Sequence, residues 1–240
     1  MLIKKIYGLI GKDIYYSFSR NYFNSKFKKL QILENEYINF DLKNISDFKK
    51  INLSNIYGFN VTIPYKEGII PLLDEVSDEA SIIGAVNTIK IINGKLKGYN
   101  TDYIGFSKSL KNKKYYHALI FGSGGACKAI QFSLMKLNIK FKVVSRQKKA
   151  HFINYDNLEK EIINSDLIIN TTPLGTYPNV NDKIQIPYEL INKSHTCYDL
   201  IYNPEKSSFL LECESQGATI KNGLEMLELQ AEASWDIWNS

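Results

Sequence analysis

Short apolar runs alternate with longer amphipathic stretches along most of this chain. The apolar runs are bounded by glycine, asparagine or serine and predict strands at 2–10, 37–40, 57–63, 86–92, 96–99, 116–121, 141–145, 166–170 and 196–201. The amphipathic stretches predict helices at 18–30, 45–53, 77–83, 102–110, 124–137, 158–163, 207–216 and 224–238. Strands that alternate with helices indicate an α/β fold with parallel pairing and right-handed crossovers.

The alternating pattern stops once and then starts again near residue 115. Before the break, Asn93-Gly94 joins two strand-like runs, which is a strong hairpin signal. We expect two α/β domains with a cleft between them: residues 1–101 together with 224–240, and a Rossmann-type doubly wound parallel sheet over 102–223. The helix at 102–110 would bridge them, and the C-terminal helix would return to the first domain.

Composition narrows the class of protein. The hydrophobic fraction is 44%, the charged fraction is 23%, and the net charge of +5 comes from scattered basic residues without a nucleic-acid-binding motif. The three cysteines are widely spaced and lack a CxxC pair, which argues against a disulfide framework and a zinc site. The chain shows neither a signal peptide nor an apolar run of about 18 residues. We expect a cytoplasmic protein without a metal, a membrane segment or nucleic acid.

A glycine-rich turn follows the strand 118–121 and opens a helix. Its residues are Gly122, Ser123, Gly124, Gly125 and Ala126. The first glycine permits a tight turn and the second lets the backbone approach a pyrophosphate, whose charge the free N–H groups at the helix start would hold. The flanking strand and helix make a dinucleotide site the favoured interpretation. Cys127 takes the third-glycine position, where we expect a packed, inert thiol.

The end of the next strand indicates which dinucleotide binds. An NAD site carries an acid about 20 residues after the glycines, to bind the ribose 2′-hydroxyl. Here the strand runs into Ser145-Arg146-Gln147-Lys148-Lys149, which holds cations and no acid. A guanidinium can pair with a 2′-phosphate, so this segment favours NADP. The alternative is a solvated basic loop.

The segment 58–66 is a candidate catalytic site. A short apolar strand ends at Pro64, because proline cannot donate to a sheet ladder, and Lys66 follows in a turn or a helix start. Open α/β sheets hold their ligands at such strand ends. Lys66 is therefore placed to handle a proton of a bound substrate.

Eight segments in order resemble the shikimate dehydrogenase family over almost the whole chain. They are Tyr7-Gly8-Leu9-Ile10-Gly11 with Ser17-Phe18-Ser19; Asn60-Val61-Thr62-Ile63-Pro64-Tyr65-Lys66; Gly84-Ala85-Val86-Asn87-Thr88-Ile89; Gly98-Tyr99-Asn100-Thr101-Asp102-Tyr103-Ile104-Gly105; Gly122 to Ala126; Asn170-Thr171-Thr172-Pro173-Leu174-Gly175; Asp199-Leu200-Ile201-Tyr202-Asn203-Pro204; and Gly223-Leu224-Glu225-Met226-Leu227-Glu228-Leu229-Gln230-Ala231.

The resemblance implies reversible NADP-linked oxidation of shikimate to 3-dehydroshikimate, on the pathway to the aromatic amino acids. The first domain would bind the substrate and the second NADP. When a hydride leaves a carbinol its hydroxyl proton must leave too, so a general base is needed. Lys66 and Asp102 are the ionisable groups that fit, and we expect them to share the proton. The alternatives are a surface lysine and a carboxylate that caps the helix at 102–110.

The resemblance also implies the remaining site residues. Ser17 and Ser19 would hold the substrate carboxylate; Thr62, Asn87 and Gln230 would bind its hydroxyls, and Tyr202 would lie beside the ring. The cofactor would contact Gly122, Ser123, Gly124, Gly125, Ala126, Ser145, Arg146, Thr171, Leu200 and Gly223. Gln230 shares a helical stripe that is otherwise apolar, so it needs a polar partner unless it reaches solvent at the stripe's edge.

Three positions depart from the family pattern. Arg20 stands where many relatives have proline, and Ser145 and Gln147 replace an asparagine and a threonine beside Arg146. Three alternatives therefore stay open: use of quinate, use of NAD, and a non-catalytic dinucleotide-binding sensor. The intact Ser17/Ser19 pair favours shikimate. A monomer and a homodimer are both compatible with the sequence.

Overall fold

The computed structural model describes residues 4–240 except 16, 111–112, 147–151 and 156–157. The chain forms two compact units. Unit 1 is Met1–Thr101 with Ala231–Ser240, and unit 2 is Asp102–Gln230. The last helix, α7 (Leu224–Asn239), therefore begins in unit 2 and ends in unit 1.

Unit 1 contains a mixed six-stranded sheet with the order β2-β1-β3-β5-β6-β4. Its strands are β1 (Lys5–Gly11), β2 (Asn35–Asp41), β3 (Ile56–Val61), β4 (Glu75–Val76), β5 (Thr88–Ile92) and β6 (Lys95–Tyr99). Strand β1 pairs in parallel with β2 and β3, whereas β5 is antiparallel to β3 and β6. The expected hairpin makes this reversal: Asn93 and Gly94 both have positive φ, as a two-residue hairpin turn requires.

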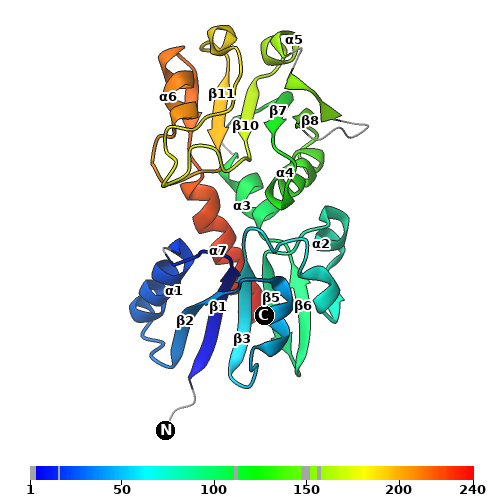
Figure 1. Cartoon of the computed structure of the whole chain (residues 1–240), viewed down its shortest axis with the longest axis vertical. Helices are drawn as coiled ribbons and strands as arrows, with labels where there is room; N and C mark the ends of the chain where they lie inside the picture. The colour runs from blue at the N-terminus through cyan, green and yellow to red at the C-terminus, as the bar shows by residue number, and fades with distance from the viewer. Residues whose placement is uncertain (1–3, 16, 111–112, 147–151, 156–157) are drawn as a thin grey trace. The chain divides into compact units, whose positions relative to one another are not determined.

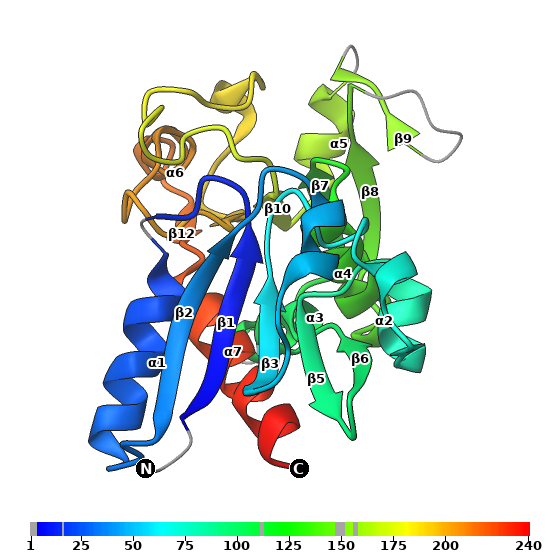
Figure 2. The same ribbon diagram turned by 60° about the horizontal axis from the view of Figure 1, so that its bottom comes forward.

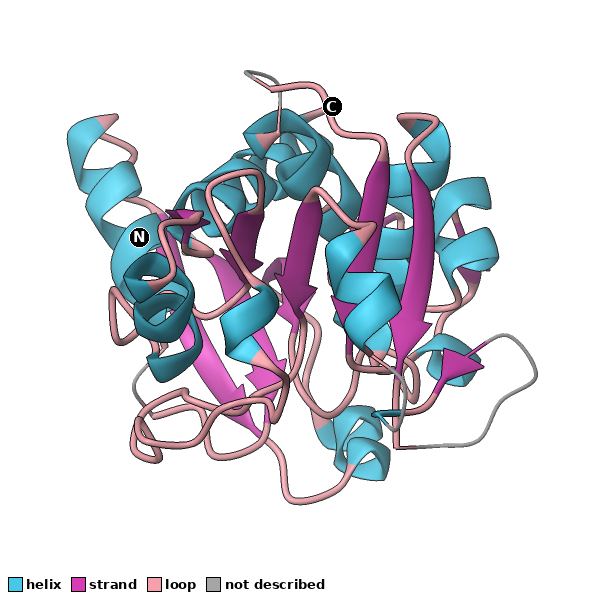
Figure 3. Ribbon diagram, turned by 90° about the horizontal axis from the view of Figure 1, so that it is seen from above, coloured by secondary structure: helices cyan, strands magenta, loops and turns pink. Residues whose placement is uncertain are grey.

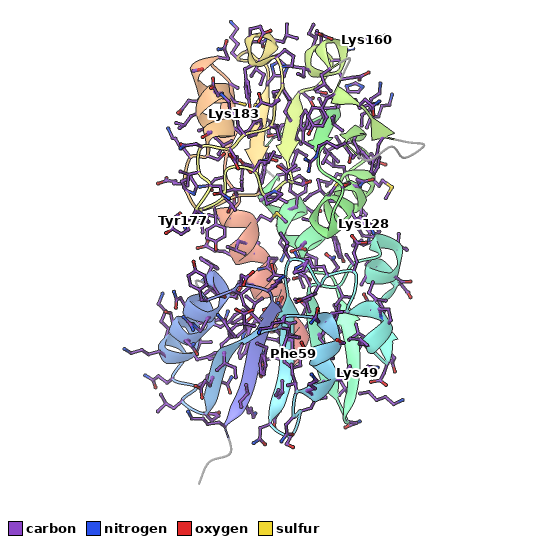
Figure 4. All side chains as sticks on the ribbon, in the orientation of Figure 1. Lys49, Phe59, Lys128, Lys160, Tyr177 and Lys183 are labelled. Carbon is purple, nitrogen blue, oxygen red and sulfur yellow. The ribbon has the colours of Figure 1, made fainter. Side chains whose placement is uncertain are left out.

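Both faces of the unit 1 sheet are covered (Figures 1 and 2). Successive side chains of a strand point to opposite faces, so Leu9 and Ile10 belong to different hydrophobic clusters. Helix α1 (Phe18–Lys29) and the end of α7 cover one face. The 3₁₀-helices η1 (Ile45–Lys50) and η2 (Ile70–Leu72) and helix α2 (Asp78–Ile83) pack with Phe59 on the other (Figure 4).

The C-terminal helix returns to the unit 1 sheet, as the sequence predicts. Trp238 donates its indole N–H to the carbonyl of Ile89 at 3.0 Å, and its ring lies where any side chain at Gly58 would overlap it. Glu232 accepts from Tyr22 and Lys26 of α1. A glycine at position 58 is therefore needed for the helix to approach the strand.

Unit 2 is a doubly wound parallel sheet with the order β12-β11-β10-β7-β8-β9 (Figure 3). Its strands are β7 (His117–Phe121), β8 (Lys140–Val144), β9 (Phe152–Ile153), β10 (Leu167–Asn170), β11 (Thr196–Asp199) and β12 (Thr219–Lys221). The chain winds outward from β7 on one side and from β10 on the other, which is the order of dinucleotide-binding folds.

Helices cover both faces of the unit 2 sheet. Helices α3 (Asp102–Ser109) and α4 (Gly125–Lys136) pack with the start of α7 on one face. Helices α5 (Glu159–Ile163) and α6 (Ser208–Ser215) pack with the segment around η4 (Tyr188–Leu190) on the other. The strands are consequently buried on both sides, which explains their continuous apolar runs.

The differences from the predicted elements are small. Strands β4, β9 and β12 have only two or three residues, too few to show an alternating pattern. The helix expected over 45–53 is a 3₁₀-helix, and the strand expected from residue 2 begins at Lys5, residues 1–3 lying outside the described chain. No helix among the described residues has the length and apolar character needed to cross a bilayer.

Candidate active site

In unit 1 the polar residues predicted to bind substrate lie at one edge of the sheet. Strand register aligns Ile10 with Val61, Asn60 with Thr88, and Thr88 with Tyr99. The carboxyl ends of β1, β3 and β6 and the amino end of β5 therefore meet there. Ser17 follows β1, Thr62 follows β3 and Asn87 precedes β5, so the topology brings the three neighbourhoods together.

Ser17 and Ser19 are both buried, at the start of α1. The Ser17 hydroxyl oxygen accepts the Arg20 N–H at 3.3 Å and so caps the helix, which leaves its proton available to a ligand. Ser19 interacts with the phenol of Tyr37, whose pKa burial raises well above its ordinary value. Ser17 is thus fixed by its capping bond, and Ser19 by burial, before any ligand binds.

Lys66 lies in a turn after β3, as expected from Pro64. The Thr62 N–H donates to Ile10 O at 2.8 Å and carries the pairing one residue beyond the strand. The Lys66 carbonyl accepts the Val86 N–H at 2.7 Å. Since Asn87 follows Val86, this bond holds the backbone at Lys66 beside the backbone next to Asn87.

Asn87 belongs to a buried polar network that the sequence did not reveal. Its Nδ2 donates to Thr101 Oγ1 at 2.9 Å and its Oδ1 accepts the Thr101 N–H at 2.6 Å. Asn60 extends the network: its Oδ1 accepts from the Tyr37 hydroxyl at 2.8 Å and its Nδ2 donates to Ser234 Oγ at 3.0 Å. These bonds satisfy groups that would otherwise be costly to bury.

In unit 2 the predicted cofactor residues follow a single row of strand ends. Register aligns Val144, Phe121, Asn170 and Asp199 across β8, β7, β10 and β11. The residues that come next in each strand are four of the predicted ones: Ser145, Gly122, Thr171 and Leu200. The row passes over the neighbouring strands β7 and β10. The winding direction of the chain changes between these two strands, and open α/β sheets bind ligands at such a point.

The turn after β7 fits a pyrophosphate. Gly122 has φ +123°, and a side chain there would overlap the Thr171 hydroxyl. A Cβ at Gly124 would meet nothing within 4 Å, so a ligand can approach the backbone there. The 12-residue helix α4 then begins at Gly125 with no acid in its first turn. Arg146 is exposed after β8 and offers a cation for a further phosphate.

Comparisons with known proteins identify the family of the chain. Residues 9–89 match the shikimate dehydrogenase substrate binding domain. The whole chain is similar to shikimate dehydrogenase (NADP(+)) of Methanococcus maripaludis, with 40% identity over 98% of this chain and 91% of the relative. The chain belongs to the shikimate dehydrogenase family.

Solved structures of the family have the same fold. The shikimate dehydrogenase of Aquifex aeolicus superposes with a TM-score of 0.89 at 36% identity, over 98% of this chain and 92% of that one. The shikimate 5-dehydrogenase of Thermus thermophilus, solved in complex with NADP(H) and shikimate, gives 0.87 at 29% identity, over 98% of this chain and 93% of that one. The α/β fold with a Rossmann-type sheet, expected from the sequence, is thereby confirmed.

The other residues implied by the family resemblance occupy the same edge of unit 2 or its helices. The backbone of Leu200 lies directly against Gly223, where any side chain would overlap the Leu200 carbonyl. Tyr202 follows two residues after Leu200 and is half-buried. Ser123 lies in the turn before α4, and Gly125 and Ala126 lie in the first turn of that helix; all three are half-buried.

Asp102 and Gln230 are the first and the last residue of unit 2. Asp102 is buried as the first residue of α3, where a helix N-terminus also favours a carboxylate. Gln230 is buried on α7, and its Nε2 donates to Leu227 O at 2.9 Å. Gly105 lets α3 approach α7 here, since a Cβ at this position would lie 2.5 Å from Met226 O.

The positions that depart from the family pattern have distinct environments. Arg20 donates from Nη2 to Tyr15 O at 3.4 Å, a bond that crosses the loop leading to Ser17. Ser145 is buried at the end of β8. Gln147 lies outside the described residues, as do Lys148 and Lys149.

Asp199 is a buried carboxylate that sequence reasoning passed over. It is fully buried at the end of β11, and this burial raises its pKa to about 6 although Ser207, Ile201 and Asn170 donate hydrogen bonds to it. Its position as the first residue of a family segment was the available signal. Within the described ranges, no group of three or more His, Cys, Asp or Glu side chains is arranged to hold a metal ion.

Proposed function

We propose that this chain catalyses the reversible oxidation of shikimate to 3-dehydroshikimate with NADP⁺, in the pathway that supplies aromatic amino acids. The observation that carries the proposal is the 40% identity over 98% of the chain to an NADP-linked shikimate dehydrogenase, with the predicted polar residues gathered at the strand ends. Bound NADP⁺ would supply the hydride acceptor.

Unit 1 would bind the substrate through short, prepositioned polar groups. We assign the carboxylate to Ser17 and Ser19 and the ring hydroxyls to Thr62 and Asn87. Support comes from the burial of Ser17, Ser19 and Asn87 and from the hydrogen bonds that fix Ser17 and Asn87, since a site that is already ordered loses less entropy when the ligand binds. Gln230 and Tyr202 complete the proposed set.

Lys66 and Asp102 would handle the proton of the reacting hydroxyl. Loss of a hydride from a carbinol leaves a carbonyl only if the hydroxyl proton also departs, and these are the two ionisable groups of the chain that fit this role. We assign the proton to the pair rather than to one residue.

Unit 2 would bind NADP⁺ at the carboxyl edge of its sheet. The α4 N-terminus and Gly122–Ala126 would take the pyrophosphate, and Arg146 the 2′-phosphate. Ser145, Thr171, Leu200 and Gly223 would line the remaining contacts. We further propose that the enzyme is cytoplasmic, because its three buried cysteines are free thiols. We propose that it is a monomer or a homodimer.

The test is absorbance at the nicotinamide band with shikimate or quinate, each combined with NADP⁺ or NAD⁺. We expect shikimate with NADP⁺ to give the highest kcat/KM. Turnover with none of the four combinations contradicts the proposal, and highest activity with quinate or NAD⁺ would replace it with a relative of different specificity.

The role of Lys66 is tested by Lys66→Ala. We expect kcat to fall by about a hundred-fold or more, since general acid–base catalysis contributes roughly 10²–10⁴. Shikimate binding should weaken less, because Lys66 is one of several polar contacts. Near-full turnover of this variant would remove Lys66 from the mechanism.

A further inference from the structure

Two buried polar side chains face each other at the ends of β10 and β11. Asn170 and Asp199 are register partners and neither is exposed. Asn170 Nδ2 donates to Asp199 Oδ1 at 3.1 Å. The pair lies in the row of strand ends from which the proposed cofactor loops leave the sheet.

Each of these side chains also holds the loop that follows its own strand. Asn170 Oδ1 accepts from the Thr172 N–H at 3.0 Å and from the Thr172 hydroxyl at 2.7 Å. Asp199 Oδ1 accepts the Ile201 N–H at 3.0 Å, and its Oδ2 accepts the Ser207 hydroxyl. One hydrogen-bonded pair thus fixes the first turn of two loops and links them to each other.

Both loops carry residues of the proposed site. Thr171 lies between Asn170 and Thr172, and its hydroxyl donates to Phe121 O at 2.7 Å beside the glycine turn. Leu200 lies between Asp199 and Ile201, in contact with Gly223. A displacement of either loop therefore moves a proposed cofactor contact, and the second loop also carries Tyr202.

We propose that Asp199, acting through Asn170, is a positioning residue that holds the loops after β10 and β11 in the arrangement that binds nucleotide and substrate. The inference rests on the proposed function. Asp199 contacts no ligand itself; it fixes the backbone of Leu200 and the approach to Tyr202.

The chain offers a matched control at the opposite edge of the same sheet. Asp166 accepts the Tyr116 N–H at 2.8 Å and the His117 N–H at 3.0 Å. It therefore ties two backbone segments together as Asp199 does, but at the amino ends of the strands, away from the row of proposed cofactor residues. Loss of either carboxylate removes two or three hydrogen bonds from unit 2.

The experiment compares Asp199→Ala, Asp199→Asn and Asp166→Ala with the wild type. Circular dichroism and melting temperature establish that each is folded, NADP⁺ affinity is measured by calorimetry, and KM and kcat are measured for shikimate. For Asp199→Ala we expect Kd and KM to rise by about ten-fold to a hundred-fold with kcat changed less. Asp199→Asn keeps an acceptor for Ile201 and Asn170 but loses the acceptor for the Ser207 hydroxyl, so Kd and KM should rise by less than about ten-fold, between the wild type and Asp199→Ala.

Equal effects of Asp199→Ala and Asp166→Ala on Kd and KM would overturn the inference, because both would then act only through stability. If Asp199→Ala does not fold, Ser207→Ala removes one donor to Asp199, together with the side-chain cap of α6, and should give a smaller rise in Kd; no rise would also count against the inference. Wild-type protein that binds NADP⁺ but oxidises neither shikimate nor quinate refutes the proposed function alone, and the comparison of nucleotide affinities still decides the role of Asp199.

Discussion

The buried carboxylate of Asp199 should make the stability of this protein depend on pH. Its side chain is fully buried, and although three groups donate hydrogen bonds to it, the loss of hydration outweighs them and raises its pKa from the ordinary 3.8 to about 6. The perturbation we consider is Asp199→Asn, which keeps the shape of the side chain and removes its titration. The variant approximates the protonated form at every pH.

The sign and size follow from the two pKa values. The folded state binds the proton more tightly than the unfolded chain, so the stabilisation is fully present below about pH 3.8 and is lost as the pH rises through about 6. The two pKa values differ by about two pH units, and each unit corresponds to about 1.4 kcal/mol. The free energy of unfolding of the wild type minus that of Asp199→Asn should therefore fall by about 3 kcal/mol between pH 3 and pH 7.

Urea unfolding of both proteins, followed by far-ultraviolet circular dichroism at half-unit pH steps, measures this difference. Other titrating groups are common to the two proteins and cancel in the subtraction. A difference that stays flat would show that the pKa of Asp199 is ordinary. A difference that rises with pH would show that the donated hydrogen bonds outweigh the burial, and the electrostatic reasoning would be refuted.

Three further substitutions test other parts of the structure. Gly58→Ala should lower the free energy of unfolding by about 2–4 kcal/mol in urea titration, because the new methyl group overlaps the indole of Trp238; an unchanged midpoint contradicts this. Arg146→Ala should raise KM for NADP⁺ by about ten-fold and leave KM for NAD⁺ unchanged, and equal changes would exclude a 2′-phosphate contact. Tyr37→Phe should cost about 1–3 kcal/mol, since Asn60 Oδ1 loses its donor, and a neutral result on melting would show that water replaces the phenol.

The features that could be predicted from the sequence depend on contacts between near neighbours. The hairpin at Asn93-Gly94 needs two adjacent residues with positive φ, and the sequence supplies them. The turn beginning at Gly122 follows its strand and opens its helix within a few residues. Lys66 follows Pro64 closely enough for the strand end to place it in a turn. In each case the residues that cause the structure lie within a few positions of one another in the sequence.

The buried polar networks could not be predicted because their partners are far apart in the chain. Asn60 and Ser234 are separated by 174 positions, and Asn170 and Asp199 by 29. Read locally, Asn170 and Asp199 are polar residues at the ends of apolar runs, which is equally typical of a cap or a solvated turn. Asn170 faces Asp199 because of the register between β10 and β11. The residues next to each of them in the sequence do not reveal that register.

The cost of keeping Asp199 supports the view that it serves function more than stability. A protein that needed only to close the end of β11 could use asparagine there, which would accept from Ile201 and Asn170 and would avoid burying a charge at neutral pH. The carboxylate instead costs about 3 kcal/mol above pH 6. What it adds is acceptors on both oxygens at once, one for the turn after β11 and one for Ser207 before α6. A group that sacrifices stability to fix a loop with proposed ligand contacts is expected where activity and stability compete.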